Sequence, residues 1–267
     1  MIIYTNALSD AECEATEDYL MNKWLGRRSP RAACTDTQSV VVAYGTVPLR
    51  VTNVDGGGGT ITAIRGDGEV VIDAATVAVL SDAETFSGRV VLKNNSTVTL
   101  AAESFAAAEW IVEAGSVLDL GGQTVTVAGI GGSGCVSNGT LIVSHVTPGT
   151  SAGTGTLTVK GDLTLADGAV VTVHYDRPDC DALQVTGLLT VAGGGTVTLE
   201  APVALNAGFS VPLISYGSIV GAERLLADWL FDGDYPKKTY TFLMEHLAGD
   251  KVVLYKGYAK GTFIFLR

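Results

Sequence analysis

A pattern of three short strands occurs twice between positions 155 and 200, with a 26-residue period. The two copies match without a gap at nine positions, which are Leu157/Leu183, Val159/Val185, Gly161/Gly187, Leu163/Leu189, Thr164/Thr190, Ala166/Ala192, Gly168/Gly194, Val171/Val197 and Thr172/Thr198. Within each strand two apolar residues flank one Thr or Gln, which is the period of a strand with one buried face. A fixed superperiod of this kind is typical of a stacked solenoid.

Turns rich in Gly and Asp, such as Gly161-Asp162 and Asp167-Gly168, join these strands and leave no room for crossover helices. A chain that turns three corners per repeat must climb, so successive coils stack in parallel with ladders of inward Leu and Val. The sequence therefore predicts an all-β fold, a right-handed parallel β-helix (β-solenoid) with about three strands per 26-residue coil over residues 60–220. An antiparallel sandwich or barrel is the alternative, although hairpins alone do not require the superperiod.

Residues 60–146 continue the series of short segments with alternating apolar residues that indicate strands, with less regular spacing between them. From Val90 to Leu141 the intervals between the first apolar residues of successive strands are 8, 12, 8, 7 and 16. Because the intervals of 8 and 12 recur, we expect these to be earlier coils with loop insertions. About six coils stacked at about 4.8 Å make a rod of roughly 30 Å.

The chain departs from the repeat before residue 60. Residues 1–26 predict a short strand and a short N-terminal helix, because Ser9 and Glu12 form a capping box and the apolar spacing continues to Trp24. Residues 27–59 carry basic residues, Pro48 and a run of glycines, and we expect a linker there.

After residue 220 we expect a C-terminal antiparallel cap over residues 221–267, because the last coil of a solenoid otherwise leaves an open sheet edge. The predicted parts are a short helix over residues 222–230, a hairpin of residues 240–245 and 251–255, and a last strand over residues 261–267.

Two segments resemble known families. Residues 3–12 and 19–24 look like the closing strand and helix of bacterial laminin-G-like (LamG-like, concanavalin A-like) jelly-roll domains, which implies that residues 1–26 are the tail of a truncated domain of that kind. Residues 60–146 together with the central repeat resemble the autotransporter-associated β-strand repeats of passenger regions in large bacterial surface proteins, and residues 155–165, 167–173 and 181–187 carry the resemblance. This second resemblance implies a secreted or surface-displayed β-helix with a scaffold or adhesive role.

The charge balance bears on partners and location. Lys and Arg number 17 against 28 Asp and Glu, and the net charge of −11 disfavours nucleic acid as a partner. No run reaches the roughly 18 apolar residues of a membrane span, and the segment from Met1 to Leu20 lacks the features of a signal peptide. The four cysteines contain no CxxC pair, which disfavours a metal site and leaves three disulfide pairings open.

The cluster that most suggests chemistry is His174, Asp176, Asp179 and Asp181, in the longest gap of the repeat. Carboxylates beside a histidine can bind a cation or act as acid and base. Asp and Pro are also common residues in turns. The equivalent corner one coil later, from Glu200 to Asn206, does not repeat the three carboxylates. We therefore favour a turn.

Other motifs are weaker. Residues 129–134 fit GxGxxG but lack the helix that a phosphate site requires, so we expect a corner of the coil. His145 and His246 have no acidic or Cys neighbour at ligand spacing, and we expect them at strand ends or on the surface.

The function that these observations favour is a non-enzymatic structural or adhesive segment of a secreted or surface-displayed bacterial protein, with no catalytic, cofactor or metal residues. Its expected partners are surface glycans or host and matrix proteins. The alternative is a polysaccharide-active or carbohydrate-binding β-helix protein whose site lies at His174, Asp176, Asp179 and Asp181.

Overall fold

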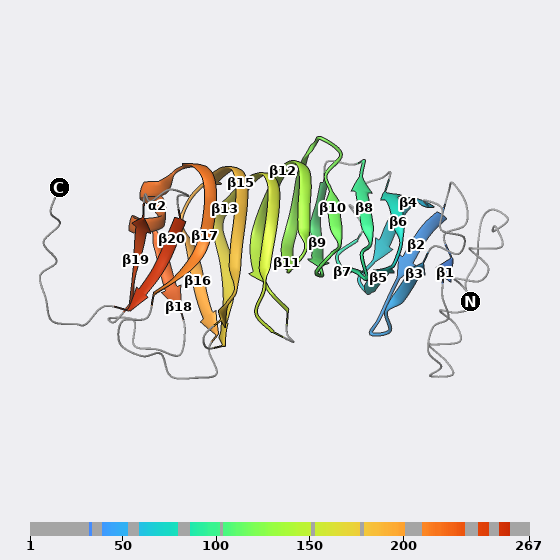
Figure 1. Ribbon diagram of the computed structural model, residues 1–267. Coiled ribbons are helices and arrows are strands. Elements are labelled where there is room, and N and C mark those ends of the chain that lie inside the picture. The colour runs from blue at the N-terminus through green and yellow to red at the C-terminus, as the bar shows by residue number, and fades with distance from the viewer. Residues whose placement is uncertain are drawn as a thin grey trace, which may run out of the picture.

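The computed structural model describes residues 32–33, 39–52, 59–79, 86–101, 104–150, 153–176, 179–200, 210–232, 240–245 and 251–256. Within these ranges the chain forms twenty strands and one short helix, so the fold is all-β (Figure 1). The elements are β1 (Ala32–Ala33), β2 (Ser39–Ala43), β3 (Leu49–Thr52), β4 (Gly59–Gly66), β5 (Glu69–Asp73), β6 (Thr76–Val79), β7 (Arg89–Lys93), β8 (Thr97–Leu100), β9 (Ser104–Val112), β10 (Val117–Asp119), β11 (Thr124–Gly132), β12 (Cys135–Pro148), β13 (Thr156–Asp176), β14 (Asp179–Cys180), β15 (Ala182–Val191), β16 (Gly195–Glu200), β17 (Ser210–Val220), α2 (Ala222–Ala227), β18 (Trp229–Asp232), β19 (Tyr240–Glu245) and β20 (Lys251–Lys256).

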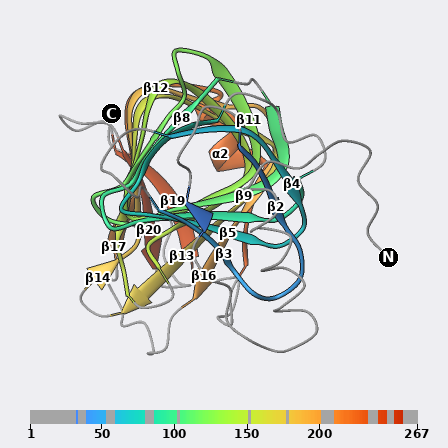
Figure 2. The same ribbon diagram turned by 90° about the vertical axis from the view of Figure 1, so that its right-hand side faces the viewer.

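Most strands pair in parallel with strands that precede and follow them by one winding of the chain, as in a solenoid. The pairing of Leu157 with Leu183 and of Val171 with Val197 is confirmed, and both pairs run parallel. An antiparallel sandwich or barrel, the alternative from the sequence, does not have such pairs. Seen along the stack, the strands form a ring around a common axis (Figure 2).

The length of chain in one winding changes along the stack. Near the N-terminal end Val70 of β5 pairs with Val90 of β7, in the middle Leu157 pairs with Leu183, and near the C-terminal end Val197 of β16 pairs with Phe231 of β18. Of these three windings, the one near the N-terminal end contains the fewest residues and the one near the C-terminal end contains the most. The expectation that the earlier coils carry loop insertions is therefore wrong, since those coils are shorter than the central repeat.

Residues in the left-handed region make the short corners possible. Asn94 and Asn95, between β7 and β8, have φ angles of 55° and 61°, and Asn138 within β12 has a φ angle of 57°. Asparagine tolerates this conformation because its short polar side chain hydrogen-bonds locally. The chain changes its direction there without extra residues.

The interior of the ring is filled by side chains that stack in register from coil to coil. One such column runs through Leu49, Val70, Val90, Trp110, Ile130, Val146, Val171 and Val197, all of which are buried. The ring of Trp110 meets that of Phe105 edge to face, with the ring centroids 5.5 Å apart. One continuous apolar core therefore follows the axis of the stack.

The stack begins before residue 60. Strand β2 pairs with β4, and β3 pairs with β5, all in parallel. Val41 and Val51 are buried, because their strands alternate inward apolar and outward residues like the later ones. The linker predicted for residues 27–59 is therefore wrong where this segment is described.

The ladder is also longer than the predicted rod. Ten strands pair in sequence along one side, namely β1, β3, β5, β7, β9, β11, β12, β13, β16 and β18. Their nine spacings at about 4.8 Å correspond to about 43 Å, against the roughly 30 Å expected from six coils. The difference comes from the short coils and the early start of the stack.

The C-terminal end carries the antiparallel element that was predicted. Strand β20 pairs antiparallel with both β19 and β17, which covers part of the last coil. The helix expected over residues 222–230 is shorter, because α2 ends at Ala227 and Trp229–Asp232 form β18, which extends the parallel ladder. Figure 2 shows α2 inside the outline of the ring.

Side chains of this end region close the core. Leu225 of α2 and Trp229 of β18 are buried. Arg224 Nη1 donates to the carbonyl oxygen of Val191 over 3.1 Å and to that of Ala192. The predicted N-terminal helix, the jelly-roll tail of residues 1–26 and the last strand over residues 261–267 lie outside the described residues.

Candidate functional site

The predicted loop around His174 is a β-hairpin that projects from the stack. The end of β13 pairs antiparallel with β14, with Tyr175 opposite Cys180 and Asp176 opposite Asp179. Figure 2 shows β14 outside the ring of strands. Asp176 and Asp179 are both exposed, as the paired residues nearest the hairpin turn.

Asp181 follows the hairpin and is fully buried, with 0% of its side chain exposed. Its Oδ1 accepts a hydrogen bond from the backbone N–H of Gly155 over 2.7 Å, and its Oδ2 accepts one from the N–H of His174 over 2.8 Å. The N–H of Asp181 in turn donates to the carbonyl oxygen of His174 over 2.8 Å. A buried carboxylate needs such donors, so Asp181 joins the two ends of one coil.

The ring of His174 lies between two carboxylates. Its Nδ1 is 2.8 Å from Oδ2 of Asp181, and its Nε2 is 2.8 Å from Oε2 of Glu200. Glu200 is the last residue of β16 and the register partner of His174 in the next coil. The structure thus brings together two of the four predicted residues and adds Glu200.

Glu200 was missed as a member of this cluster although the repeat contains the signal. His174 and Glu200 are one repeat period apart in the chain, as Leu157 and Leu183 are. The corner at Glu200 does not repeat the carboxylates of the hairpin, but Glu200 itself stacks against His174, because parallel coils place equivalent positions side by side.

The two described cysteines, Cys135 and Cys180, are free thiols. Burial, together with the neighbouring charge of Asp181, raises the pKa of Cys180 from the ordinary 9.0 to about 12. Cys180 therefore remains a protonated thiol at neutral pH and is a poor nucleophile and metal ligand. Cys13 and Cys34 lie outside the described residues.

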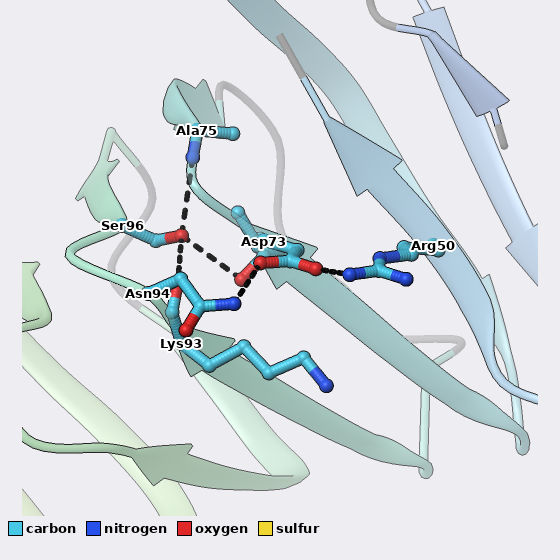
Figure 3. Close-up of polar contacts among 7 residues, drawn as sticks. Arg50, Asp73, Ala75, Lys93, Asn94 and Ser96 are labelled. Carbon is cyan, nitrogen blue, oxygen red and sulfur yellow. Dashed lines mark hydrogen bonds and ion pairs between the residues drawn. The ribbon is translucent and has the colours of Figure 1, made fainter.

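A second polar cluster lies at a corner near the N-terminal end, around the buried carboxylate of Asp73 (Figure 3). Asn94 Nδ2 donates to Oδ1 of Asp73 over 2.6 Å, and Arg50 forms an ion pair with Oδ2. Arg50, Asp73 and Asn94 belong to three successive coils. This cluster was not predicted, because the central repeat does not contain the shorter coil length that aligns these residues.

Ser96, which is buried beside that cluster, links the same corners (Figure 3). Its Oγ lies 2.6 Å from the carbonyl oxygen of Lys93 and 3.0 Å from that of Ile72, and it accepts a hydrogen bond from the N–H of Ala75 over 3.2 Å. Its own N–H donates to Oγ of Ser116, one coil later, over 3.2 Å. These contacts satisfy backbone groups inside the corner.

The GxGxxG segment is part of the coil. Residues 129–132 form the end of β11, and Gly132 has a φ angle of 98°. A Cβ on Gly132 would lie 2.1 Å from the carbonyl oxygen of Val112 in the preceding coil. Close contact between coils accounts for this glycine. The corner expected over residues 129–134 is limited to residues 133–134, which form a bend after β11. His145 on β12 is exposed, as expected for a surface residue, and His246 lies outside the described residues.

In the described ranges, no three His, Cys, Asp or Glu side chains are grouped so that they could hold a metal ion. The same part of the chain contains no helix with the length and apolar character needed to cross a membrane. A comparison of the whole sequence with models of known protein families and with curated proteins found no match.

Proposed function

We propose that this chain is a rigid, non-enzymatic spacer or adhesive stalk in a secreted or surface-displayed bacterial protein. In this proposal the solenoid-like stack is a right-handed parallel β-helix with three faces per coil. The observation that carries the proposal is the unbroken ladder of parallel strands from β1 to β18. An element of this kind keeps its two ends at a fixed separation.

The corner carboxylates support a structural role. Four aspartates each accept a hydrogen bond from a group 19 to 26 residues away in the chain, namely Asp73 from Asn94, Asp119 from Asn138, Asp162 from Leu188 and Asp181 from Gly155. Asp181, one of the residues that suggest catalysis in the sequence, is thus one of several aspartates that join neighbouring coils. The resemblance of residues 155–187 to passenger repeats agrees with this role and suggests surface display.

The proposed partners are surface glycans or host and matrix proteins. The outward positions of the strands carry many hydroxyl groups, including those of Thr126, Thr164 and Thr190, which follow one another along one side with Ile142 between the first two. The net charge of −11 argues against nucleic acid as a partner.

A distance measurement across the stack tests the spacer role. Spin labels at Val47→Cys and Leu230→Cys, both exposed positions near opposite ends, are introduced after the four natural cysteines are replaced by serine. A rigid stack gives one narrow distance distribution centred at about 40 Å. A broad distribution, or a centre below about 25 Å, contradicts a rigid spacer of this length.

The alternative is a polysaccharide-active or carbohydrate-binding protein. It is favoured by the half-exposed ring of His174, which contacts Glu200 beside a hairpin with the exposed residues Asp176 and Asp179. Hydrolysis or lysis of polysaccharides that is lost in Asp176→Asn, Asp179→Asn or Glu200→Gln would replace the spacer proposal. Binding on a glycan array without turnover supports the adhesive form of the proposal.

A further inference from the structure

His174 connects two coils through its two ring nitrogens. Its Nδ1 faces the buried carboxylate of Asp181, and its Nε2 faces the carboxylate of Glu200, each over 2.8 Å. Asp181 has no exposed side-chain surface, whereas 57% of the Glu200 side chain is exposed. Strands β13 and β16, which carry His174 and Glu200, lie side by side in register (Figure 1).

Each of the two contacts requires a proton between the ring nitrogen and the carboxylate oxygen. A ring nitrogen and a carboxylate oxygen are held at 2.8 Å by a proton between them, because two lone pairs repel each other. A neutral imidazole carries only one N–H, so it satisfies only one of the two carboxylates. When both carboxylates are ionised, His174 makes both contacts at once only as an imidazolium.

We propose that His174 is a pH-sensitive latch that ties the C-terminal end of β16 to the preceding coil. As an imidazolium it donates to both Asp181 and Glu200, and as a neutral imidazole it releases Glu200. The remaining N–H stays with Asp181, because a buried carboxylate that loses a donor is destabilised more than a solvated one. The latch does not depend on the proposed spacer role.

The hairpin that carries the ring has acidic and uncharged side chains beside it. Asp176 and Asp179, the charged groups of the described hairpin residues, are both acidic, and Cys180, the residue before Asp181, is an uncharged thiol. Tyr175, next to His174, is buried.

The strands on either side add few titratable groups. Gly149, directly after β12, lies against Asp181, where a Cβ would be 2.0 Å from Oδ1, and His145 of β12 pairs in register with Val170. On the far side of β16, β18 ends at Asp232, the register partner of Thr198. Glu200 is therefore the group on β16 whose contact depends on the proton of His174.

A double-mutant cycle tests the latch in the full chain. The unfolding equilibrium constant is measured in urea at about pH 5.5 and about pH 8, on either side of the usual histidine titration, for the parent, His174→Gln, Glu200→Gln and the double variant. At the lower pH we expect a coupling of about two- to fivefold in that constant, as for partly exposed ion pairs. At the higher pH we expect the coupling to disappear. Equal coupling at both pH values, or none at the lower one, overturns the proposal.

The pair of Arg89 and Glu109 is the matched control, because it also joins neighbouring strands, with 3.3 Å between Nη2 and Oε2, but contains no histidine. Its coupling, measured with Arg89→Gln and Glu109→Gln, is expected to be the same at both pH values.

If His174→Gln fails to fold, nuclear magnetic resonance of the unmodified chain tests the proposal instead. The proposal then requires that both ring nitrogens are protonated at the lower pH and that the carboxyl carbon of Glu200 shifts together with the ring as the pH rises. An independent shift of Glu200 overturns it.

Discussion

Several polar side chains at the corners of this molecule form hydrogen bonds across coils. Asp73 and Asp181 are buried and accept hydrogen bonds from Asn94 Nδ2 and from the backbone N–H of Gly155, respectively. A buried carboxylate without such donors costs several kcal/mol, so these residues tolerate few substitutions. An acidic composition in a chain of this kind therefore reflects coil-to-coil bonding as well as surface charge.

The thiol of Cys180 provides a pH-dependent prediction at the residue scale. Burial and the charge of Asp181 raise its pKa from 9.0 to about 12, so the unfolded chain releases this proton before the folded one does. The associated stability is present below pH 9.0 and is lost as the pH rises towards 12. We expect the free energy of unfolding to fall less steeply between these pH values in Cys180→Ala than in the parent, measured by urea unfolding.

Alkylation gives an independent measure of the same thiol. At about pH 8, iodoacetamide should modify Cys180 at least about a hundredfold more slowly in the folded chain than in urea, because only the thiolate reacts. Peptide mass spectrometry reports each cysteine separately, and the half-buried Cys135 serves as the reference within the same sample. A Cys180 that reacts equally fast in both states contradicts the burial argument.

Residue contacts were predictable only where the coil length was visible in the sequence. The partnership of His174 with Glu200 follows from the 26-residue period, which was recognised, although the pair itself was not. The cluster of Arg50, Asp73 and Asn94 depends on shorter coils, for which the sequence has no matching repeat. Burial of Asp181 depends on the space left by Gly149, a contact between segments that no local pattern reports.

At the scale of elements, the corners determine how long each coil is. The expected order of strands holds because alternating apolar residues report the inward face of each strand directly. The predicted linker was wrong because Pro48 and the run of glycines were taken as part of a linker that leads into the first coil, whereas β3 begins at Leu49 and β4 at Gly59. Gly and Pro mark turns, and in this stack of parallel strands turns occur within the ordered structure.

Substitution of two glycines with positive φ angles distinguishes the cost of backbone strain from the cost of a steric clash between coils. At Gly132 a Cβ would lie 2.1 Å from the carbonyl oxygen of Val112, whereas at Gly122 it would meet no atom within 4 Å. We expect Gly132→Ala to destabilise the fold by about 3 to 5 kcal/mol, and Gly122→Ala by roughly 1 to 2 kcal/mol from strain alone. Urea unfolding of both variants measures the difference, and equal losses show that β9 and β11 do not approach as closely as described.

At the scale of the whole molecule, the coils of the stack follow one another along a single axis. Each coil contacts the coils before and after it, and columns such as Leu49 to Val197 join them into one core. The overall class was predictable because the 26-residue period and the inward Leu and Val ladders are both visible in the chain. The length of the stack was not, since it depends on corner conformations of residues such as Asn94 and Asn138.

Deletion of one coil tests this organisation directly. Because Leu157 and Leu183 occupy the same position in successive coils, removal of residues 157–182 joins Thr156 to Leu183 and keeps every later side chain on its original face. We expect this variant to retain a parallel β-sheet spectrum by circular dichroism and a cooperative thermal transition. Removal of residues 157–181 is the matched control: it leaves one residue more at the junction, so Ala182 takes the inward position and Leu183 faces outward. We expect that control to aggregate or to lose its cooperative transition. Similar behaviour of the two variants contradicts a stack held together by registered inward side chains.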